Sequence, residues 1–184
     1  RVAIESVYSA KHNPICDSLA LHAISILVQN LPHCSDLEMD RLLKTKTAAS
    51  MASLGSVGGC INTATAHHVG GIFDVPHGDA NAIMLPHSMR FNAEASAERQ
   101  ALIAQAMGID TSSMSDHSAA LAAADAVEDL RNSLGLPGRL RDVGVPEDGL
   151  ELIAAATLKD RSLATNPTPV TDAGPIMLVL RSSW

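Results

Sequence analysis

Apolar and polar positions follow a helical rather than a strand period along most of this chain. The clearest case begins at Asn13-Pro14, a favourable helix entry because proline tolerates the first turn. From there to about Asn30, apolar residues recur at steps of three and four, which predicts one amphipathic helix. These residues are Leu19, Ala20, Ala23, Ile24, Leu27, Val28 and Leu31. No alternating pattern long enough for a strand appears, and no repeat or low-complexity linker interrupts the chain.

Start and stop signals divide the remainder into further helices. Ser35 and Glu38 have the spacing of a capping box, which predicts a long helix through Leu54. Ser115 is expected to cap another helix, and Thr171 to cap the last one. A sharp loop is expected at residues 74–78. Helices are expected at residues 61–73, 80–89, 93–107, 116–134, 147–160 and from 171 onward.

This reading gives seven or eight helices in an all-α, multi-helix bundle. The 184 residues favour a single domain spanning 1–184, because a chain of this length builds one substantial core. Its hydrophobic content of 46% comes mainly from small aliphatic side chains, with one Trp, one Tyr and two Phe, a composition that suits close helix packing. The chain starts without methionine in what looks like a helix, which suggests a fragment.

Charge and cysteine usage narrow the function classes. A formal net charge of −7 argues against nucleic acid as a partner, because such proteins concentrate Lys and Arg on one face. No apolar run approaches the roughly 20 residues of a membrane span, and no signal peptide is apparent, so a cytoplasmic protein is expected. Cys16, Cys34 and Cys60 lack C-x-x-C spacing, so they are expected to be reduced, mostly buried, and not part of a zinc site.

Histidine is the residue type that points to chemistry. His67, His68 and His77 fall in one short window, and His87 follows ten residues later. Imidazole is both a common metal ligand and a proton-transfer group near neutral pH. His77 is the strongest candidate, because it lies between Pro76 and Gly78 at an expected turn, where a loop can present a side chain rigidly toward a cleft. The other four histidines are assigned no role.

Several motifs resemble the iron-containing alcohol dehydrogenases, which include the maleylacetate reductases and have a dehydroquinate synthase-like C-terminal domain. The most specific is Pro-His-Gly-Asp-Ala-Asn-Ala-Ile-Met-Leu-Pro-His at residues 76–87, preceded by His-His-Val-Gly-Gly at 67–71. Residues 140–145 and 166–171 match in order as well. The resemblance implies a two-domain enzyme in which an α/β domain binds NAD(P) and a helical domain holds Fe or Zn. This chain resembles the second domain, and the absence of a G-x-G-x-x-G turn agrees with a missing nucleotide-binding domain.

The family's metal ligands map only partly onto this chain. The resemblance makes His77 a metal ligand and His67 a non-ligand histidine near the nicotinamide and substrate, suited to proton relay. Thr63 stands where one ligand histidine is expected and Val2 where another is, and the ligand aspartate would precede residue 1. A depleted metal site is therefore predicted. Recruitment of His68 or His87 into an altered site is the less favoured reading.

Two functional hypotheses follow. The leading one is the metal and substrate domain of an NAD(P)-dependent oxidoreductase acting on small alcohol or carbonyl substrates, inactive alone. With a nucleotide domain supplied, His67 and Thr63 would donate hydrogen bonds to the carbonyl oxygen in place of the cation. The alternative is a degenerate helical module for association or regulation, with an exposed apolar face and a homodimeric state. Residues 159–161 are interpreted as a solvated helix end, and residues 166–171 as architecture.

Overall fold

Nine α-helices and four short 3-10 helices, with no strand, make up the computed structural model, which describes residues 1–184. This confirms the all-α expectation. The α-helices are α1 (Val2–Tyr8), α2 (Pro14–Asn30), α3 (Met39–Leu54), α4 (Ile61–Phe73), α5 (His77–Asn92), α6 (Ala97–Ala106), α7 (Asp116–Ser133), α8 (Leu150–Thr157) and α9 (Ala173–Ser183). The 3-10 helices are η1 (Leu31–Asp36), η2 (Leu140–Val143), η3 (Glu147–Gly149) and η4 (Arg161–Thr165).

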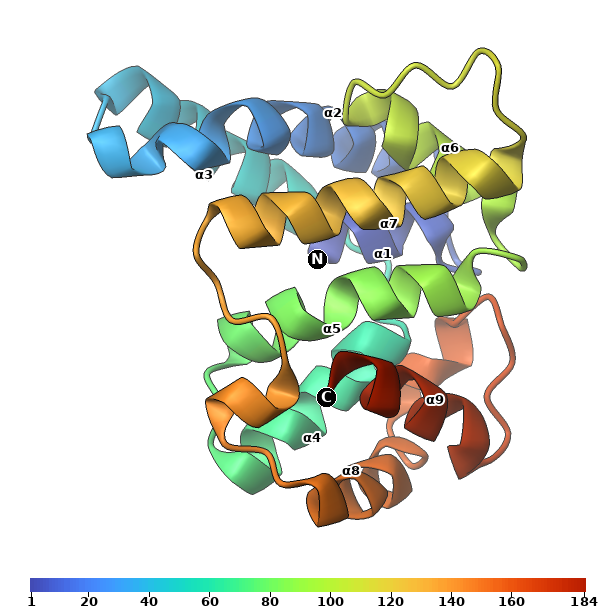
Figure 1. Ribbon diagram of the computed structural model, residues 1–184. Helices are drawn as coiled ribbons and strands as arrows, with labels where there is room; N and C mark the ends of the chain where they lie inside the picture. Colours follow the sequence, from blue (N-terminus) through green and yellow to red (C-terminus); the bar gives the residue numbers. More distant parts are fainter.

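The helices form two packed groups that meet at α5. One core is built by α1, α2, α3, α6 and α7, and ten of its 19 buried residues are alanine, which lets the helices approach closely. The other core is built by α4, α8 and α9. Helix α5 runs between the groups (Figure 1) and contributes Leu85 and Met89 to the first core and Ile83 and Met84 to the second.

Some helix starts match the sequence signals and others do not. The side chain of Asn13 accepts a hydrogen bond from the Cys16 N–H, and Ser115 caps α7 as expected. The capping box is wrong, because α3 begins at Met39 and its N-cap residue, Glu38, makes no side-chain cap bond. The last helix is capped by Asp172, whereas the preceding residue, Thr171, was expected to cap it.

Two boundaries bear on the candidate site. His77 is the first residue of α5, so it lies on a helix terminus rather than within the expected loop. The single helix expected over 147–160 is broken into η3 and α8, and the chain then turns at Asp160 into η4. This turn directs Asp160 back toward α4.

The N-terminus of α4 is held by side chains from distant parts of the chain. Glu5 of α1 is fully buried and accepts hydrogen bonds from the Cys60 and Thr63 N–H groups, at 2.9 and 3.2 Å. Asn166 accepts from the Ile61 N–H at 3.1 Å. Free N–H groups at a helix start need such partners, and a carboxylate there also meets the positive end of the helix dipole. The orientation of α4, and of the histidines it carries, is fixed in this way.

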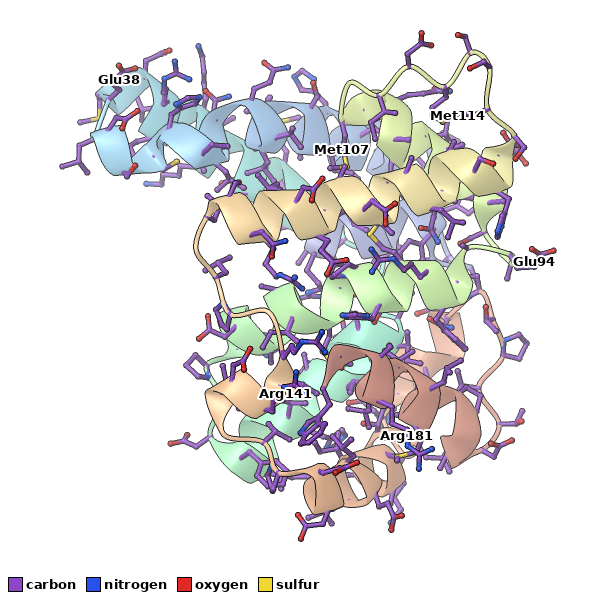
Figure 2. The ribbon with its side chains drawn as sticks, in the orientation of Figure 1. Glu38, Glu94, Met107, Met114, Arg141 and Arg181 are labelled. Atoms are coloured by element: carbon purple, nitrogen blue, oxygen red, sulfur yellow. The ribbon has the colours of Figure 1, made fainter.

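Helices α2 and α3 form an antiparallel arm, residues 14–54, that extends from the body of the molecule (Figure 1), with Glu38 at its tip (Figure 2). By length and composition alone, the segment Pro14–Asp36 could span a membrane, which corrects the expectation that no run is long enough. Within the fold, however, α2 packs against α1, α3 and α6, and its Asp17 pairs with Arg99 at 2.6 Å.

The cysteines form no disulfide. Cys60 is buried, whereas Cys16 and Cys34 are partly exposed, so the expectation of mostly buried thiols is wrong for two of the three. Burial raises the pKa of the Cys60 thiol above its ordinary range, and the nearby Glu5 carboxylate adds to this. Cys60 is therefore protonated at neutral pH and serves as a core residue.

Candidate functional site

A histidine–aspartate pair joins two elements that are distant in sequence. The Nδ1 atom of His67 on α4 lies 3.0 Å from the Oδ2 atom of Asp160, at the turn between α8 and η4. The imidazole is 47% exposed, whereas the carboxylate is 14% exposed. A carboxylate on Nδ1 orients the ring and leaves Nε2 free for a ligand. The pair thus has the arrangement of a proton-transfer group with its orienting partner.

The Asp160 carboxylate is itself fixed in place. Its Oδ1 atom accepts a hydrogen bond from the Ser162 N–H at 2.8 Å, so Asp160 caps η4. Partial burial acts to raise the pKa of Asp160, but the hydrogen bonds from Ser162 and His67 outweigh it and hold the pKa below its ordinary value. Asp160 is therefore ionised at neutral pH. The sequence does not indicate this role, because Lys159-Asp160-Arg161 has the composition of a solvated helix end and nothing local indicates that the chain turns inward there.

His77 lies directly beside His67. The two rings are stacked, with centroids 5.7 Å apart and planes inclined by 16°. Partial desolvation lowers the pKa of His77, and the positive charges of Arg1 and His67 lower it further. His77 is consequently neutral at pH 7. The structure therefore brings both sequence-predicted site residues together, at the middle of α4 and the first residue of α5.

His68, which also belongs to the window, and His87, which follows it, differ in their placement. His68 Nε2 lies 3.5 Å from the same Asp160 oxygen, although adjacent positions on a helix point in different directions. Only His67 is hydrogen-bonded to this carboxylate, and His68 Nε2 has no hydrogen-bond partner. His87 is separate from this group and lines a different cavity, next to Arg90, Phe91 and Ser182.

A second polar network lies where the resemblance places metal ligands. The Arg1 guanidinium donates to Thr63 Oγ1 at 2.7 Å and lies 3.4 Å from a Glu5 oxygen. The Thr63 hydroxyl donates in turn to the Glu5 carboxylate. The Thr63 proton is therefore already used, which corrects the expectation that this hydroxyl is available to a carbonyl substrate. Val2, at the other expected ligand position, offers no donor atom.

These side chains do not fit an Fe or Zn ion. No group of three or more His, Cys, Asp or Glu side chains is arranged to hold a metal. Imidazole lone pairs lie in the ring plane, so the near-parallel rings of His67 and His77 do not converge on one point. A guanidinium, itself a cation, is hydrogen-bonded to Thr63, where a ligand would be needed. Protein sites for these metals use three or four convergent donors.

Comparison with known proteins places this geometry in a family. Residues 2–184 match the family described as Fe-containing alcohol dehydrogenase family, C-terminal. A 1,3-propanediol dehydrogenase of Citrobacter freundii is 37% identical over 172 residues, covering 90% of this chain and 44% of that protein. Maleylacetate reductase 1 of Rhodococcus opacus is 31% identical over 188 residues, covering 99% and 48% respectively.

A solved structure agrees. The crystal structure of a 1,3-propanediol oxidoreductase superposes with a TM-score of 0.93 at 32% identity, and covers 100% of this chain and 49% of that one. The chain thus spans about half the length of the relatives it matches. These matches confirm the resemblance that the histidine motifs indicated. The chain belongs to the Fe-containing alcohol dehydrogenase family and corresponds to its C-terminal domain.

Proposed function

We propose that this chain is the substrate-side half of an NAD(P)-linked oxidoreductase that acts on small alcohol or carbonyl compounds through a depleted metal site. The observation that carries the proposal is the His67–Asp160 pair, held beside His77 on one face of the domain. Two relatives name their nucleotide, an NAD-dependent methanol dehydrogenase of Bacillus methanolicus and an NADPH-dependent butanol dehydrogenase of Clostridium saccharobutylicum. This chain contains no recognisable Gly-rich turn that would bind the phosphates of either nucleotide. We therefore assign nucleotide binding to a partner domain.

His67 supplies the proton in the proposed reaction. In the reducing direction, the nicotinamide would give a hydride to the carbonyl carbon, so the oxygen gains electron density and needs a proton. His67 Nε2 gives this proton to the oxygen, while Nδ1–H stays hydrogen-bonded to Asp160, which stabilises the imidazolium before transfer. The product is the alcohol, and His67 is left neutral and recovers its proton from solvent through its exposed edge.

No step of this scheme uses a metal ion. At the positions where the family resemblance implies metal ligands, this chain has the Arg1–Glu5–Thr63 network, whose cation is a guanidinium. Fixed charges and donors that face developing negative charge stabilise a transition state without a metal. Arg1 is the side chain of this network that carries the positive charge, so we propose that it takes over electrostatic stabilisation of the substrate oxygen.

The test is nucleotide oxidation by the gene product that contains residues 1–184. We expect turnover of short aliphatic aldehydes with NADH or NADPH that survives EDTA. Replacement of His67 by Asn should lower kcat by about 100-fold or more, the range of general acid catalysis. The matched control is His117→Asn, because His117 is half exposed and lies 3.5 Å from Glu94 at the surface. Turnover that EDTA abolishes, or equal kcat for His67→Asn and wild type, would contradict the proposal.

One observation favours the alternative hypothesis, a non-catalytic helical module for association or regulation. The arm of residues 14–54 carries five large apolar side chains that are more than half exposed: Ile15, Leu37, Met39, Leu43 and Leu54. Such exposure is typical of a surface that associates with another chain. A gene product that forms a dimer through this arm, yet oxidises neither NADH nor NADPH with any aldehyde, would support this alternative over the enzyme.

A further inference from the structure

Side-chain amides link the start of α4 to the start of α5. Asn62, the second residue of α4, donates from Nδ2 to the Oδ1 atom of Asn81 at 2.8 Å. Asn81 in turn donates from its own Nδ2 to the backbone carbonyl of His77 at 2.7 Å. Asn62 is fully buried and Asn81 is 8% exposed, so both bonds lie in the low-dielectric interior, where hydrogen bonds are stronger. Hydrogen bonds in series therefore connect α4 with the backbone of a site residue.

The first turn of α5 has little else to restrain it. Its N-cap residue is Pro76, and no side chain accepts from the free N–H groups of this turn. Gly78 follows His77, and glycine loses more conformational freedom in a helix than other residues do. A Cβ atom added at Gly78 would meet nothing within 4 Å, so packing does not confine the backbone there either. The bond from Asn81 thus supplies a restraint that the local sequence lacks.

The other end of the link is rigid. Side chains of Glu5 and Asn166 bond the first N–H groups of α4 and fix the helix in place. Asn62 and His67 belong to this same helix of 13 residues, so they keep a constant relation to each other. The stacked rings of His67 and His77 are therefore both tied to α4, His67 directly and His77 through the two amides.

Packing alone does not explain an asparagine at position 62. Its Oδ1 atom is buried and has no hydrogen-bond partner. A buried, unpaired acceptor opposes folding, and an apolar side chain of similar size would remove this penalty. The donor group of Asn62 is therefore the useful part of the side chain, and its partner is Asn81.

We propose that Asn62 and Asn81 are positioning residues, which hold the His77 ring against His67 through the His77 carbonyl. Stacking covers one face of the His67 imidazole and so limits its orientation. The inference rests on the proposed function in one respect, because this orientation matters for turnover only if His67 is the proton donor. The link ends on a backbone carbonyl, so it acts on the rings through the first turn of α5.

The test is proton NMR of the gene product that contains residues 1–184, without substrate, nucleotide or metal. An aromatic ring displaces the resonances of protons that lie over its face, so the His67 ring protons should move when His77→Ala removes the stacked ring. The double variant Asn62→Leu/Asn81→Leu should lose most of this displacement. It should also keep the helical circular dichroism of wild type, because replacing both partners of a buried hydrogen bond by apolar groups is nearly neutral for stability.

Asn30→Leu is the matched control. Asn30 on α2 is also buried, and it donates to the carbonyl four residues earlier, that of Ile26, at 2.7 Å, as Asn81 does to His77. Because Asn30 lies on the arm of residues 14–54, its replacement should leave the displacement of the His67 signals unchanged.

Asn81→Ala guards against misfolding of the double variant. Asn81 lines an open cavity between α5 and α7, so water can replace its amide beside Asn62. This variant should also lose most of the displacement. In turnover, both variants should lower kcat at least about tenfold and leave KM unchanged, since a misplaced proton donor acts in the chemical step.

Three results would overturn the inference: the displacement retained in either folded variant, an equal loss in Asn30→Leu, or an unchanged kcat in a variant that has lost the displacement. A wild type whose His67 signals do not move on His77→Ala would do so as well. The NMR measurement needs no turnover. A wild type that shows the displacement, yet oxidises no nucleotide, therefore refutes the proposed function and leaves the positioning by the two asparagines standing.

Discussion

Asp160 accepts a hydrogen bond from the Nδ1–H group of His67 at 3.0 Å, although 93 residues separate the two in the sequence. The contact exists because the chain leaves α8, turns at Asp160 into η4 and faces the middle of α4. This contact gives the His67 ring a defined orientation, which sets His67 apart from the other histidines of the motif. The same carboxylate lies 3.5 Å from His68 Nε2, which makes no hydrogen bond of its own.

Asp160→Asn should weaken the fold in a pH-dependent way. Because the folded-state pKa of Asp160 lies below its ordinary value of 3.8, the charged form stabilises the fold above that pH. Wild type should therefore exceed Asp160→Asn by about 1 kcal/mol in free energy of unfolding at pH 7. The difference should disappear as pH falls below 3.8. Urea denaturation at pH 7, 5 and 3 tests this, with exposed Asp148→Asn as control.

His87 should also make the fold less stable in acid, but over a higher pH range. Burial lowers the pKa of His87 from 6.5 to about 4; the Glu128 charge opposes this, and three nearby arginines add to it. Between these two pH values the unfolded chain binds the proton and the folded chain does not. The free energy of unfolding should then fall as pH drops from 6.5 to 4, by up to about 1.4 kcal/mol per pH unit.

Replacing His87 by Gln removes this proton. The variant should show a shallower loss of stability than wild type over the same pH range, whereas His117→Gln, at an exposed position, should follow wild type. Thermal unfolding at pH 6.5, 5.5 and 4.5 provides the measurement. Parallel curves for wild type and His87→Gln would show that His87 titrates normally.

The Glu5 network should matter for stability as well as for chemistry. Glu5 is fully buried and accepts from two backbone N–H groups, so Glu5→Gln should reduce the free energy of unfolding by about 3 kcal/mol, the range for breaking a buried, charged set of hydrogen bonds. Asp40→Asn is the control, because Asp40 pairs with Lys44 in an exposed i,i+4 bridge; its loss should stay below about 0.5 kcal/mol. A loss for Glu5→Gln as small as the control's would mean that α4 does not depend on Glu5.

Two glycines should respond in opposite directions to alanine. A Cβ atom at Gly149 would overlap the Phe73 ring, so Gly149→Ala should destabilise the packing of η3 on α4 by about 1–3 kcal/mol. Gly71 lies within α4 with no atom near the added Cβ, so Gly71→Ala should stabilise the chain by about 0.5–1 kcal/mol. Chemical denaturation measures both changes in the free energy of unfolding. A shift in the same direction for the pair would contradict the packing around Phe73.

Helix periodicity and capping residues account for most of what the sequence predicted about the fold. Asn13 and Ser115 begin their helices as expected, because a side-chain cap acts locally. The capping box predicted at Ser35 and Glu38 does not form, because residues 31–36 form a 3-10 helix instead. Leu37 then takes a left-handed conformation before α3 begins. Such a turn depends on how α2 and α3 pack, which local spacing does not record.

The candidate site was predictable only in part. His67 and His77 come together as their shared motif implied, since the motif itself spans the turn between α4 and α5. Asp160 and Arg1 were not predicted, because each reaches the site through a contact made across the fold. Thr63 was predicted as a missing ligand, but its engagement with Arg1 and Glu5 required knowledge of side-chain positions.

The metal content of the purified chain is the decisive measurement for the depleted site. We predict far less than one Fe or Zn ion per chain, with no change on His77→Ala, because the guanidinium of Arg1 already meets Thr63 where a ligand would be needed. One tightly bound ion per chain that is lost in His77→Ala would contradict this prediction, since His77 would then be a working ligand.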